Sequence, residues 1–381
     1  MDTVARTPKR RKRMPLNMWG WIFIIPFFIA FLWFQAVPLG ETFYFSFFKY
    51  MKVTSATKGT FWIQKFIGWD NFYSGDPNVS SLFGPGGYQD IGYQNMYIFG
   101  VSVGKLYAPN IIYYLINTML IWIMGFIPQI IVSLALAIWF TDARLKLKAT
   151  GFWKTVMYMP NLIMAAAFGL LFNLMFSSSG PVVQILNSMG ILSGEFSFMS
   201  NEFWCHFVIA LINFLMWFGN TTLLLMSGIM GIDQSIFESA AVDGSGAQRT
   251  FWQITLPLLK PIFLYVVITS LIGGVQLYDV SYIFTQGGGG MNQSSYTIMN
   301  YLADLIQHNN YGLSSALSVF MFIITAILSL SLYFVNNRNR SADKDVASSR
   351  RKRFREYGEF PGTAKDIATF KAMKQGMEGG K

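Results

Sequence analysis

The feature that most constrains this chain is a series of nearly uncharged apolar stretches, each about as long as a helix that crosses a bilayer. Such a helix needs about 20 residues to span about 30 Å of hydrocarbon. Six stretches of this length occur, at residues 19–39, 111–140, 152–176, 206–228, 262–284 and 313–335. We therefore predict an all-α integral membrane protein with six transmembrane helices.

The composition supports a membrane protein and excludes several other classes. Of 381 residues, 53% are hydrophobic and only 13% are charged, which is about half the usual charged share of a soluble domain. A water-soluble globule of this length could not cover its surface with so few charges, and the same figures exclude a disordered chain. Because Cys205 is the single cysteine, a disulfide framework and a cysteine-rich metal site are excluded as well.

The basic residues predict the orientation of the chain. The 29 Lys and Arg residues cluster at or beyond the ends of the apolar stretches, and a cytoplasmic N-terminus would place 24 of them on the cytoplasmic side, as the positive-inside rule requires. An even number of spans then places the C-terminus in the cytoplasm too. Basic residues that flank membrane spans differ from the basic patch on a nucleic-acid-binding domain. We therefore predict no nucleic-acid partner.

The predicted domain organisation is a basic cytoplasmic N-terminus (1–18), a transmembrane domain (19–335) and a basic cytoplasmic tail (336–381). The first apolar stretch exceeds the 7–15 residues of a signal-peptide core and lacks a small-residue cleavage site, which favours an uncleaved span. The first outer loop (41–110) is long enough for a small structured cap. The tail is predicted to be a disordered segment that is attracted to anionic lipid headgroups.

No catalytic constellation is present in the sequence. His206 and His308 are not part of an H-E-x-x-H metal motif. Gly104-Lys105 is followed by Leu106 and lacks the glycine that a phosphate-binding P-loop needs five positions earlier. We predict that the chain is not an enzyme and holds no metal or other cofactor itself.

The cytoplasmic loop between the fourth and fifth spans (233–257) is the most informative segment. Its first part predicts a helix with one apolar stripe, formed by Ile236, Phe237, Ala240 and Ala241. This helix would have nothing in its own chain to pack against, so we expect it to dock in a groove on a partner. The alternative is an interfacial helix that lies on the lipid.

Glycines and prolines predict how this loop continues. Gly244 and Gly246 permit a sharp turn after the helix. Pro257 and Pro261 are expected to end the second segment before it enters the membrane.

The loop also resembles a known family. The spacing of Glu238, Gly244, Ile254 and Leu256-Pro257 resembles the EAA loop of binding-protein-dependent ABC transporter permeases, and Asp243 and Pro261 resemble its carbohydrate-uptake branch, the maltose and glycerol-phosphate type. Further resemblances are Phe66-Ile67-Gly68-Trp69-Asp70-Asn71-Phe72, Asn117-Thr118, Tyr158-Met159-Pro160, Thr285-Gln286-Gly287-Gly288, Tyr311-Gly312 and Ser315-Ala316. The departures are Ser239, Ser245 and Gly289, and none of them disturbs the expected fold.

This resemblance implies the six-helix fold of a type I ABC importer permease in the bacterial inner (plasma) membrane. The partners that it implies are a second homologous permease, a dimer of cytoplasmic ATPases that holds ATP and Mg²⁺, and an extracytoplasmic solute-binding protein that delivers a sugar or oligosaccharide. Transport would proceed by alternating access. The alternatives are a non-sugar polar solute such as a glycerophosphodiester, a passive channel or secondary transporter, and a membrane-embedded enzyme.

The resemblance assigns the contact with the ATPase to one short segment. Glu238 would meet a basic or backbone-donor site in the ATPase groove, Ala240 and Ala241 would pack there, and Gly244 would form the elbow. Glu238 could instead cap or solvate the helix. The full predicted coupling set is Glu238, Ser239, Ala240, Ala241, Asp243 and Gly244.

Polar and aromatic residues within the spans predict the solute site, since such groups are costly in a membrane unless they face a cavity. Asn213, Trp217 and Asn220 share one helix face. Their amides can bond hydroxyl groups, and the indole offers a flat apolar face to a sugar ring. Asn213 also falls where related sugar permeases carry an asparagine. The alternative is hydrogen bonding to the partner permease.

The fifth span adds further candidates. Gly273 and Gly274 would allow close approach of another helix, and Gln276 and Asp279 would add polar groups to the same span. Asp279 would bind solute, pair with the partner permease or lie near the outer mouth. Asn161 is a further candidate for solute contact.

Overall fold

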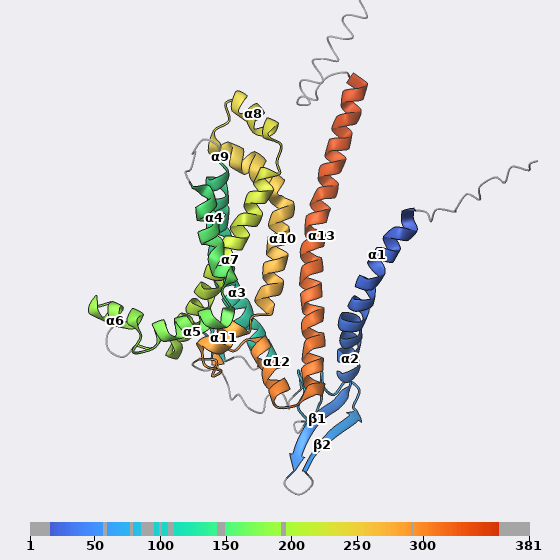
Figure 1. Ribbon diagram of the computed structural model, residues 1–381, viewed down its shortest axis with the longest axis vertical. Coiled ribbons are helices and arrows are strands. Elements are labelled where there is room, and N and C mark those ends of the chain that lie inside the picture. The colour runs from blue at the N-terminus through green and yellow to red at the C-terminus, as the bar shows by residue number, and fades with distance from the viewer. Residues whose placement is uncertain are drawn as a thin grey trace, which may run out of the picture. The chain divides into compact units, whose positions relative to one another are not determined.

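The computed structural model describes residues 16–55, 59–76, 79–84, 95–98, 101–105, 110–142, 149–191, 196–290 and 293–357. Helices dominate these ranges, and strands are confined to the part between the first two spans (Figure 1). The longer helices are α1 (Leu16–Phe31), α2 (Val37–Phe45), α3 (Asn110–Thr141), α4 (Thr150–Tyr158), α5 (Ala165–Phe176), α6 (Pro181–Ser188), α7 (Glu202–Met230), α8 (Gln234–Val242), α10 (Leu256–Val275), α12 (Ile298–Gln307) and α13 (Tyr311–Tyr357). The shorter elements are η1 (Leu32–Ala36), η3 (Met159–Leu162), η4 (Phe198–Ser200), α9 (Ala247–Thr250), η5 (Phe251–Thr255) and α11 (Asp279–Phe284).

Within the described residues, six helical segments are long and apolar enough to cross a membrane, which confirms the predicted number of spans. They are Phe23–Phe45, Ile111–Thr141, Ala165–Ser188, Glu202–Met230, Ala247–Val275 and Tyr311–Phe334. The second, fourth and sixth segments agree with the predicted boundaries to within a few residues. Two expectations remain predictions. One is that the transmembrane domain covers residues 19–335, and the other is that both termini lie in the cytoplasm.

The third predicted span, 152–176, is wrong as a single helix. Helix α4 ends at Tyr158, a 3₁₀ turn covers Met159–Leu162, and Ile163 is extended with φ −84° and ψ 138°. Pro160 explains the break, because it has no N–H to continue the helix and its ring clashes with the preceding turn.

The fifth predicted span, 262–284, is wrong at both ends, and so is the expected proline stop. Helix α9, the π turn η5 and α10 follow one another without interruption, with Pro261 inside α10. In η5, the Leu256 N–H donates to the Phe251 carbonyl, five residues back. This shifted hydrogen bond lies directly before Pro257, so the helix continues past both prolines and ends at Val275.

The sixth helix continues beyond its span. Helix α13 reaches Tyr357, so the prediction of a disordered tail is wrong for residues 336–357, while residues 358–381 lie outside the described residues. No glycine or proline occurs from Leu313 to Tyr357, and Gly358 follows, as is common where a helix ends.

The chain forms two compact units. The first comprises Met1–Ile123, Ala165–Ala210 and Val275–Ile323, and the second comprises Met124–Met164, Leu211–Gly274 and Ile324–Lys381. The apolar core of the first unit contains Leu82, Ile111, Tyr113, Tyr114, Val275, Ile298, Leu313, Ala316, Leu317 and Met321. The core of the second contains Ala137, Leu225, Met226, Ile229 and Leu259.

The first unit carries two hairpins within residues 41–110, which confirms the expected structured cap for the described residues. Strand β1 (Phe48–Ser55) pairs with β2 (Gly59–Phe66), and β3 (Asn95–Ile98) pairs with β4 (Val101–Lys105), both antiparallel. The side-chain N–H groups of buried Asn71 donate to the carbonyls of Ser46 and Phe48, each at 2.8 Å. Asn71 therefore ties the base of β1 to the turn that follows β2.

The start of α3 contacts the connection between α11 and α12 in the first unit. The Tyr114 hydroxyl donates to the Gln293 side chain at 3.0 Å, and the Asn117 amide donates to the Gln293 carbonyl at 3.3 Å. The Thr118 hydroxyl accepts from the Ile298 N–H at 3.1 Å, at the start of α12. The Asn117-Thr118 pair thus fixes where α12 begins.

Contacts within each unit agree with six alternating spans. In the first unit, the Lys52 N–H donates to the Asn309 carbonyl at 3.1 Å, so the first and fifth connections lie on one side. In the second unit, Asp142 and Phe237 line one cavity, so the second and fourth connections lie together.

Close packing of α7 against α4 generates a testable prediction. A Cβ atom on Gly219 would collide with the Met157 carbonyl, whereas a Cβ on Gly273 would meet nothing within 4 Å. Gly219→Ala is therefore expected to destabilise the fold by about 1–3 kcal/mol through overpacking. The readout is thermal unfolding in detergent, with Gly273→Ala as the matched control. Equal melting temperatures for the two variants would contradict this packing.

Candidate functional site

Helix α8 begins at an N-terminal cap formed by Asp233. The side chain of Asp233 accepts from the Ser235 N–H at 3.0 Å, which satisfies one of the free N–H groups of the first turn. The same interaction with Ser235 lowers the pKa of the Asp233 carboxyl below its ordinary value, because the hydrogen bonds stabilise the ionised form. The cap therefore remains charged at neutral pH.

Helix α8 ends at Gly244 in a Schellman motif. The Gly244 N–H donates to the Ala241 carbonyl at 3.1 Å, and the Ser245 N–H donates to the Ala240 carbonyl at 2.9 Å. Gly244 has φ +70°, a conformation that favours glycine, so its predicted role in the turn is confirmed. Gly246 has φ −68° and does not need to be glycine.

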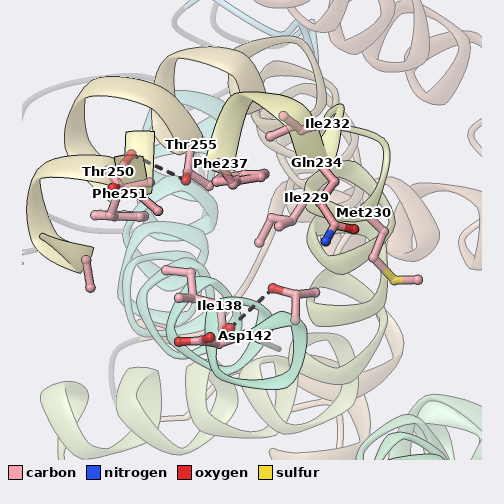
Figure 2. Close-up of a pocket in the computed structure, with 13 residues that line it drawn as sticks. Ile138, Asp142, Ile229, Met230, Ile232, Gln234, Phe237, Thr250, Phe251 and Thr255 are labelled. Carbon is pink, nitrogen blue, oxygen red and sulfur yellow. Dashed lines mark hydrogen bonds between the residues drawn. The ribbon is translucent and has the colours of Figure 1, made fainter. Parts of the chain in front are cut away.

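A cavity of about 580 Å³ lies beneath α8 (Figure 2). It is bounded by the ends of α3 and α7, by α8 itself and by the α9–η5 turn, and it is open on part of its surface. The lining is mainly apolar, and Asp142 is the only charged residue among the described residues that line it. The lining residues are Ile138, Thr141, Asp142, Ile229, Met230, Ile232, Gln234, Phe237, Ala241, Ala247, Thr250, Phe251 and Thr255.

The prediction that α8 has nothing in its own chain to pack against is wrong. Phe237 and Ala241 line the cavity, and Ala240 is 6% exposed. Part of the apolar stripe therefore faces the rest of the second unit, because the ends of α3 and α7 provide an apolar surface there. Ala240 is covered by this chain itself and is not available to a partner.

The opposite face of α8 is the one available to a partner. Val242 is 87% exposed, and the sequence analysis missed it because it lies off the apolar stripe. Glu238, Ser239 and Asp243 are exposed too. The Ser239 hydroxyl donates to the Ser235 carbonyl at 2.7 Å, whereas the side chain of Glu238 makes no hydrogen bond or ion pair to any residue that the structure describes.

Four of the predicted solute residues lie on or beside one segment of α7 in the second unit. Asn213 and Asn220 are half-buried on α7, and Trp217 between them is 47% exposed. The Asn161 amide donates to the Met216 carbonyl at 3.2 Å, beside Trp217 in the sequence. Asn161 therefore ties η3 to the same segment of α7.

The other predicted solute residues are not arranged as expected. Helix α10 ends at Val275, so Gln276 and Asp279 are not on the fifth span, and both are exposed in the first unit. Gly273 and Gly274 lie near the end of α10, and within the described chain nothing lies within 4 Å of a Cβ built on Gly273. The described residues therefore do not make the close approach that was predicted at Gly273.

Two polar residues of α3 that the sequence analysis did not single out bind α7. The buried Gln129 amide donates to the Thr221 hydroxyl at 2.7 Å, and the Ser133 hydroxyl donates to the Phe218 carbonyl at 2.8 Å. Their spacing of four residues within an apolar stretch was the sequence signal that could have predicted these contacts.

Among the residues that the structure describes, no group of three His, Cys, Asp or Glu side chains could hold a metal ion.

Residues 96–341 match the family described as binding-protein-dependent transport system inner membrane component. This match includes five of the six spans, the α8 loop and the polar residues of α7. The chain therefore belongs to this family of multi-pass membrane permeases.

Two similar proteins are sugar permeases by name. The lactose transport system permease protein LacF of Rhizobium radiobacter is 29% identical over 220 residues, which are 57% of this chain and 73% of that protein. The arabinooligosaccharides transport system permease protein AraP of Halalkalibacterium halodurans is 29% identical over 195 residues, which are 50% of this chain and 61% of that protein.

Solved structures share the fold. One is a bacterial ABC transporter involved in the import of the acidic polysaccharide alginate, with a TM-score of 0.61 and 18% identity over 84% of this chain and 96% of that chain. The second is a bacterial alginate ABC transporter in complex with an alginate pentasaccharide-bound periplasmic protein, with a TM-score of 0.59 and 18% identity over 84% of this chain and 95% of that chain. This likeness confirms the permease fold that the resemblance implied.

Proposed function

We propose that this chain is a permease subunit of an ABC importer that takes up a sugar or oligosaccharide. The observation that carries the proposal is the family match over residues 96–341, which includes the α8 loop. The names of the similar permeases, for lactose and arabinooligosaccharides, favour a carbohydrate over another polar solute.

In the proposed importer, this chain is one subunit of a larger assembly. A second homologous permease completes the pathway, a dimer of cytoplasmic ATPases binds ATP and Mg²⁺, and a solute-binding protein outside the membrane delivers the sugar. The chain itself is not catalytic. The basic segments at its two ends favour a cytoplasmic location for both termini.

Helix α8 is the coupling element, and its outward face contacts the ATPase. Val242 supplies apolar area at the contact, and Glu238 supplies a charge that no described residue of the chain pairs. The cap at Asp233 and the Schellman motif at Gly244 fix both ends of α8. A rigid helix with defined ends can transmit the closure of the ATPase dimer to α7 and α10.

Solute passes along the polar face of α7. Trp217 exposes nearly half of its surface and provides a flat apolar face for a sugar ring. Asn213 and Asn220 flank it, and an amide can both donate to and accept from sugar hydroxyls.

Uptake in proteoliposomes that contain the assembled importer tests the coupling role. We expect the sugar-loaded binding protein to stimulate ATP hydrolysis and sugar uptake. Gly244→Ala places a Cβ at φ +70°, at a cost of about 1 kcal/mol, and should lower the sugar imported per ATP hydrolysed while membrane insertion is unchanged. Gly246→Ala is the matched control. No hydrolysis response in the wild-type importer would refute the proposed function, and equal ratios for both variants would refute the elbow role.

The solute role of Trp217 is tested by uptake kinetics in the same vesicles. Loss of a ring-stacking contact of about 0.5–1.5 kcal/mol predicts that Trp217→Ala raises the half-saturating sugar concentration by about twofold to thirteenfold. Trp217→Phe retains a flat ring and should recover most of the wild-type value. An unchanged half-saturating concentration in Trp217→Ala would contradict a place for Trp217 in the solute path.

A further inference from the structure

The β1–β2 hairpin carries exposed aromatic and basic side chains that neither the coupling helix nor the solute path uses. Trp62 is 52% exposed and Phe66 is 66% exposed. Lys52 pairs across the strands with Trp62, so these three side chains lie on one face of the hairpin. Lys49 and Lys65 lie on the other face of the hairpin. We call the exposed aromatic and basic side chains of both faces the hairpin platform.

The platform has an electrostatic cost that the fold does not explain. Lys49 lies directly opposite Lys65 in the hairpin register, and both are exposed. Like charges in directly opposite positions destabilise a sheet. With Lys52, the two strands carry three lysines and no acidic residue, so an anionic partner would relieve this repulsion.

The platform is preformed. Tyr50 stacks on Trp62 with 5.2 Å between ring centroids, and Tyr311 lies 5.7 Å from Trp62. A Cβ on Gly312 would collide with the Phe48 carbonyl, so the start of α13 lies directly against β1. A partner would bind a surface that is already rigid, which lowers the entropic cost of association.

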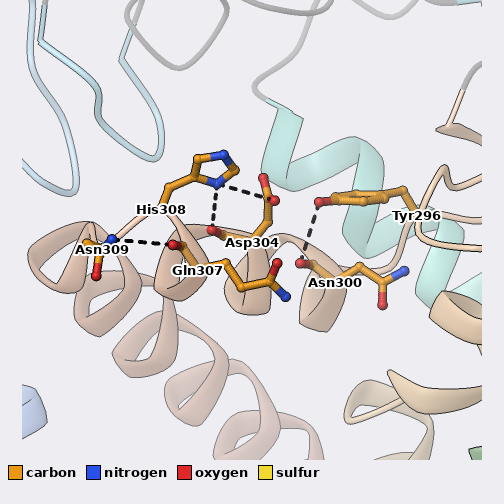
Figure 3. A network of polar contacts seen from close by, with 6 residues as sticks. All are labelled: Tyr296, Asn300, Asp304, Gln307, His308 and Asn309. Carbon is orange, nitrogen blue, oxygen red and sulfur yellow. Dashed lines mark hydrogen bonds and ion pairs between the residues drawn. The ribbon is translucent and has the colours of Figure 1, made fainter.

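The turn before α13 joins the platform to the rest of the first unit. The Lys52 N–H donates to the Asn309 carbonyl at 3.1 Å. Next to Asn309, the His308 ring nitrogen lies 3.4 Å from the Asp304 carboxylate at the end of α12 (Figure 3). A partner docked on β1 and β2 would therefore also lie close to α12.

We propose that the hairpin platform docks an acidic surface of the solute-binding protein. This inference rests on the proposed function, which places the first connection outside the membrane, on the side opposite α8. Exposed aromatic side chains are enriched at protein interfaces, and the lysines of the hairpin give charge complementarity to an acidic partner. Sugar sites are concave, whereas this hairpin exposes side chains on both faces.

The test measures binding-protein-stimulated ATP hydrolysis by the assembled importer in nanodiscs of phosphatidylcholine alone. Lys49→Gln/Lys65→Gln should raise the concentration of sugar-loaded binding protein needed for half-maximal stimulation by about tenfold, with the basal and maximal rates unchanged. High salt should reduce the difference by screening the charges. Lys154→Gln/Lys260→Gln removes the same charge elsewhere and should behave as wild type. Because the double change removes a like-charge pair, the melting temperature should not fall.

Each contrary outcome identifies what fails. An unchanged half-maximal concentration would overturn the docking proposal alone. A defect that appears only when anionic lipid is added would assign the platform to the membrane surface, and a defect in the uptake of free sugar without binding protein would assign it to the sugar. No stimulation of the wild-type importer would overturn the proposed function and this proposal with it.

Discussion

The hydrocarbon of a bilayer offers no water to a broken helix, so each interrupted backbone group needs a partner within the protein. This constraint accounts for the buried amides and hydroxyls beside the helix breaks. Asn173 on α5 donates to the Phe284 carbonyl at the end of α11 at 2.7 Å, and the Thr297 hydroxyl donates to the Leu277 carbonyl at 2.7 Å, directly after α10. These side chains allow the chain to bend while its backbone groups stay paired.

The same requirement explains why the short motifs that resemble the permease family lie outside the middle of the spans. Asn71 ties the hairpin to the end of the first span, and Thr118 fixes the start of α12. Gly289 departs from the family proline, and its φ of +69° is one that proline cannot adopt. It is instead held by hydrogen bonds with Thr285 and Ser295. Motif residues thus hold connections in place, whereas the proposed solute path runs along α7 at residues such as Trp217.

The sequence predicted the number of spans because the length of an apolar stretch is a direct measure of bilayer thickness. It predicted the turn at Gly244 because few other residues adopt that backbone conformation. It did not predict that α10 continues past Pro257 and Pro261, since the π turn before them leaves no pattern in the sequence. The sequence showed the apolar stripe on α8 but not the surface of α3 and α7 against which part of it packs. Periodicity shows which residues share a face, and it does not show what that face contacts. Val242 was missed for the same reason.

The division of α8 into a face that packs on its own chain and a face that binds the ATPase is the central claim, and cysteine cross-linking tests it most directly. Cys205 is buried and is the only native cysteine, so a cysteine introduced on α8 is the accessible thiol of this chain. In the assembled importer, Val242→Cys should cross-link to the ATPase subunit through a short bifunctional maleimide, and Ala240→Cys should not. Cross-linking from position 240 but not from position 242 would contradict the account.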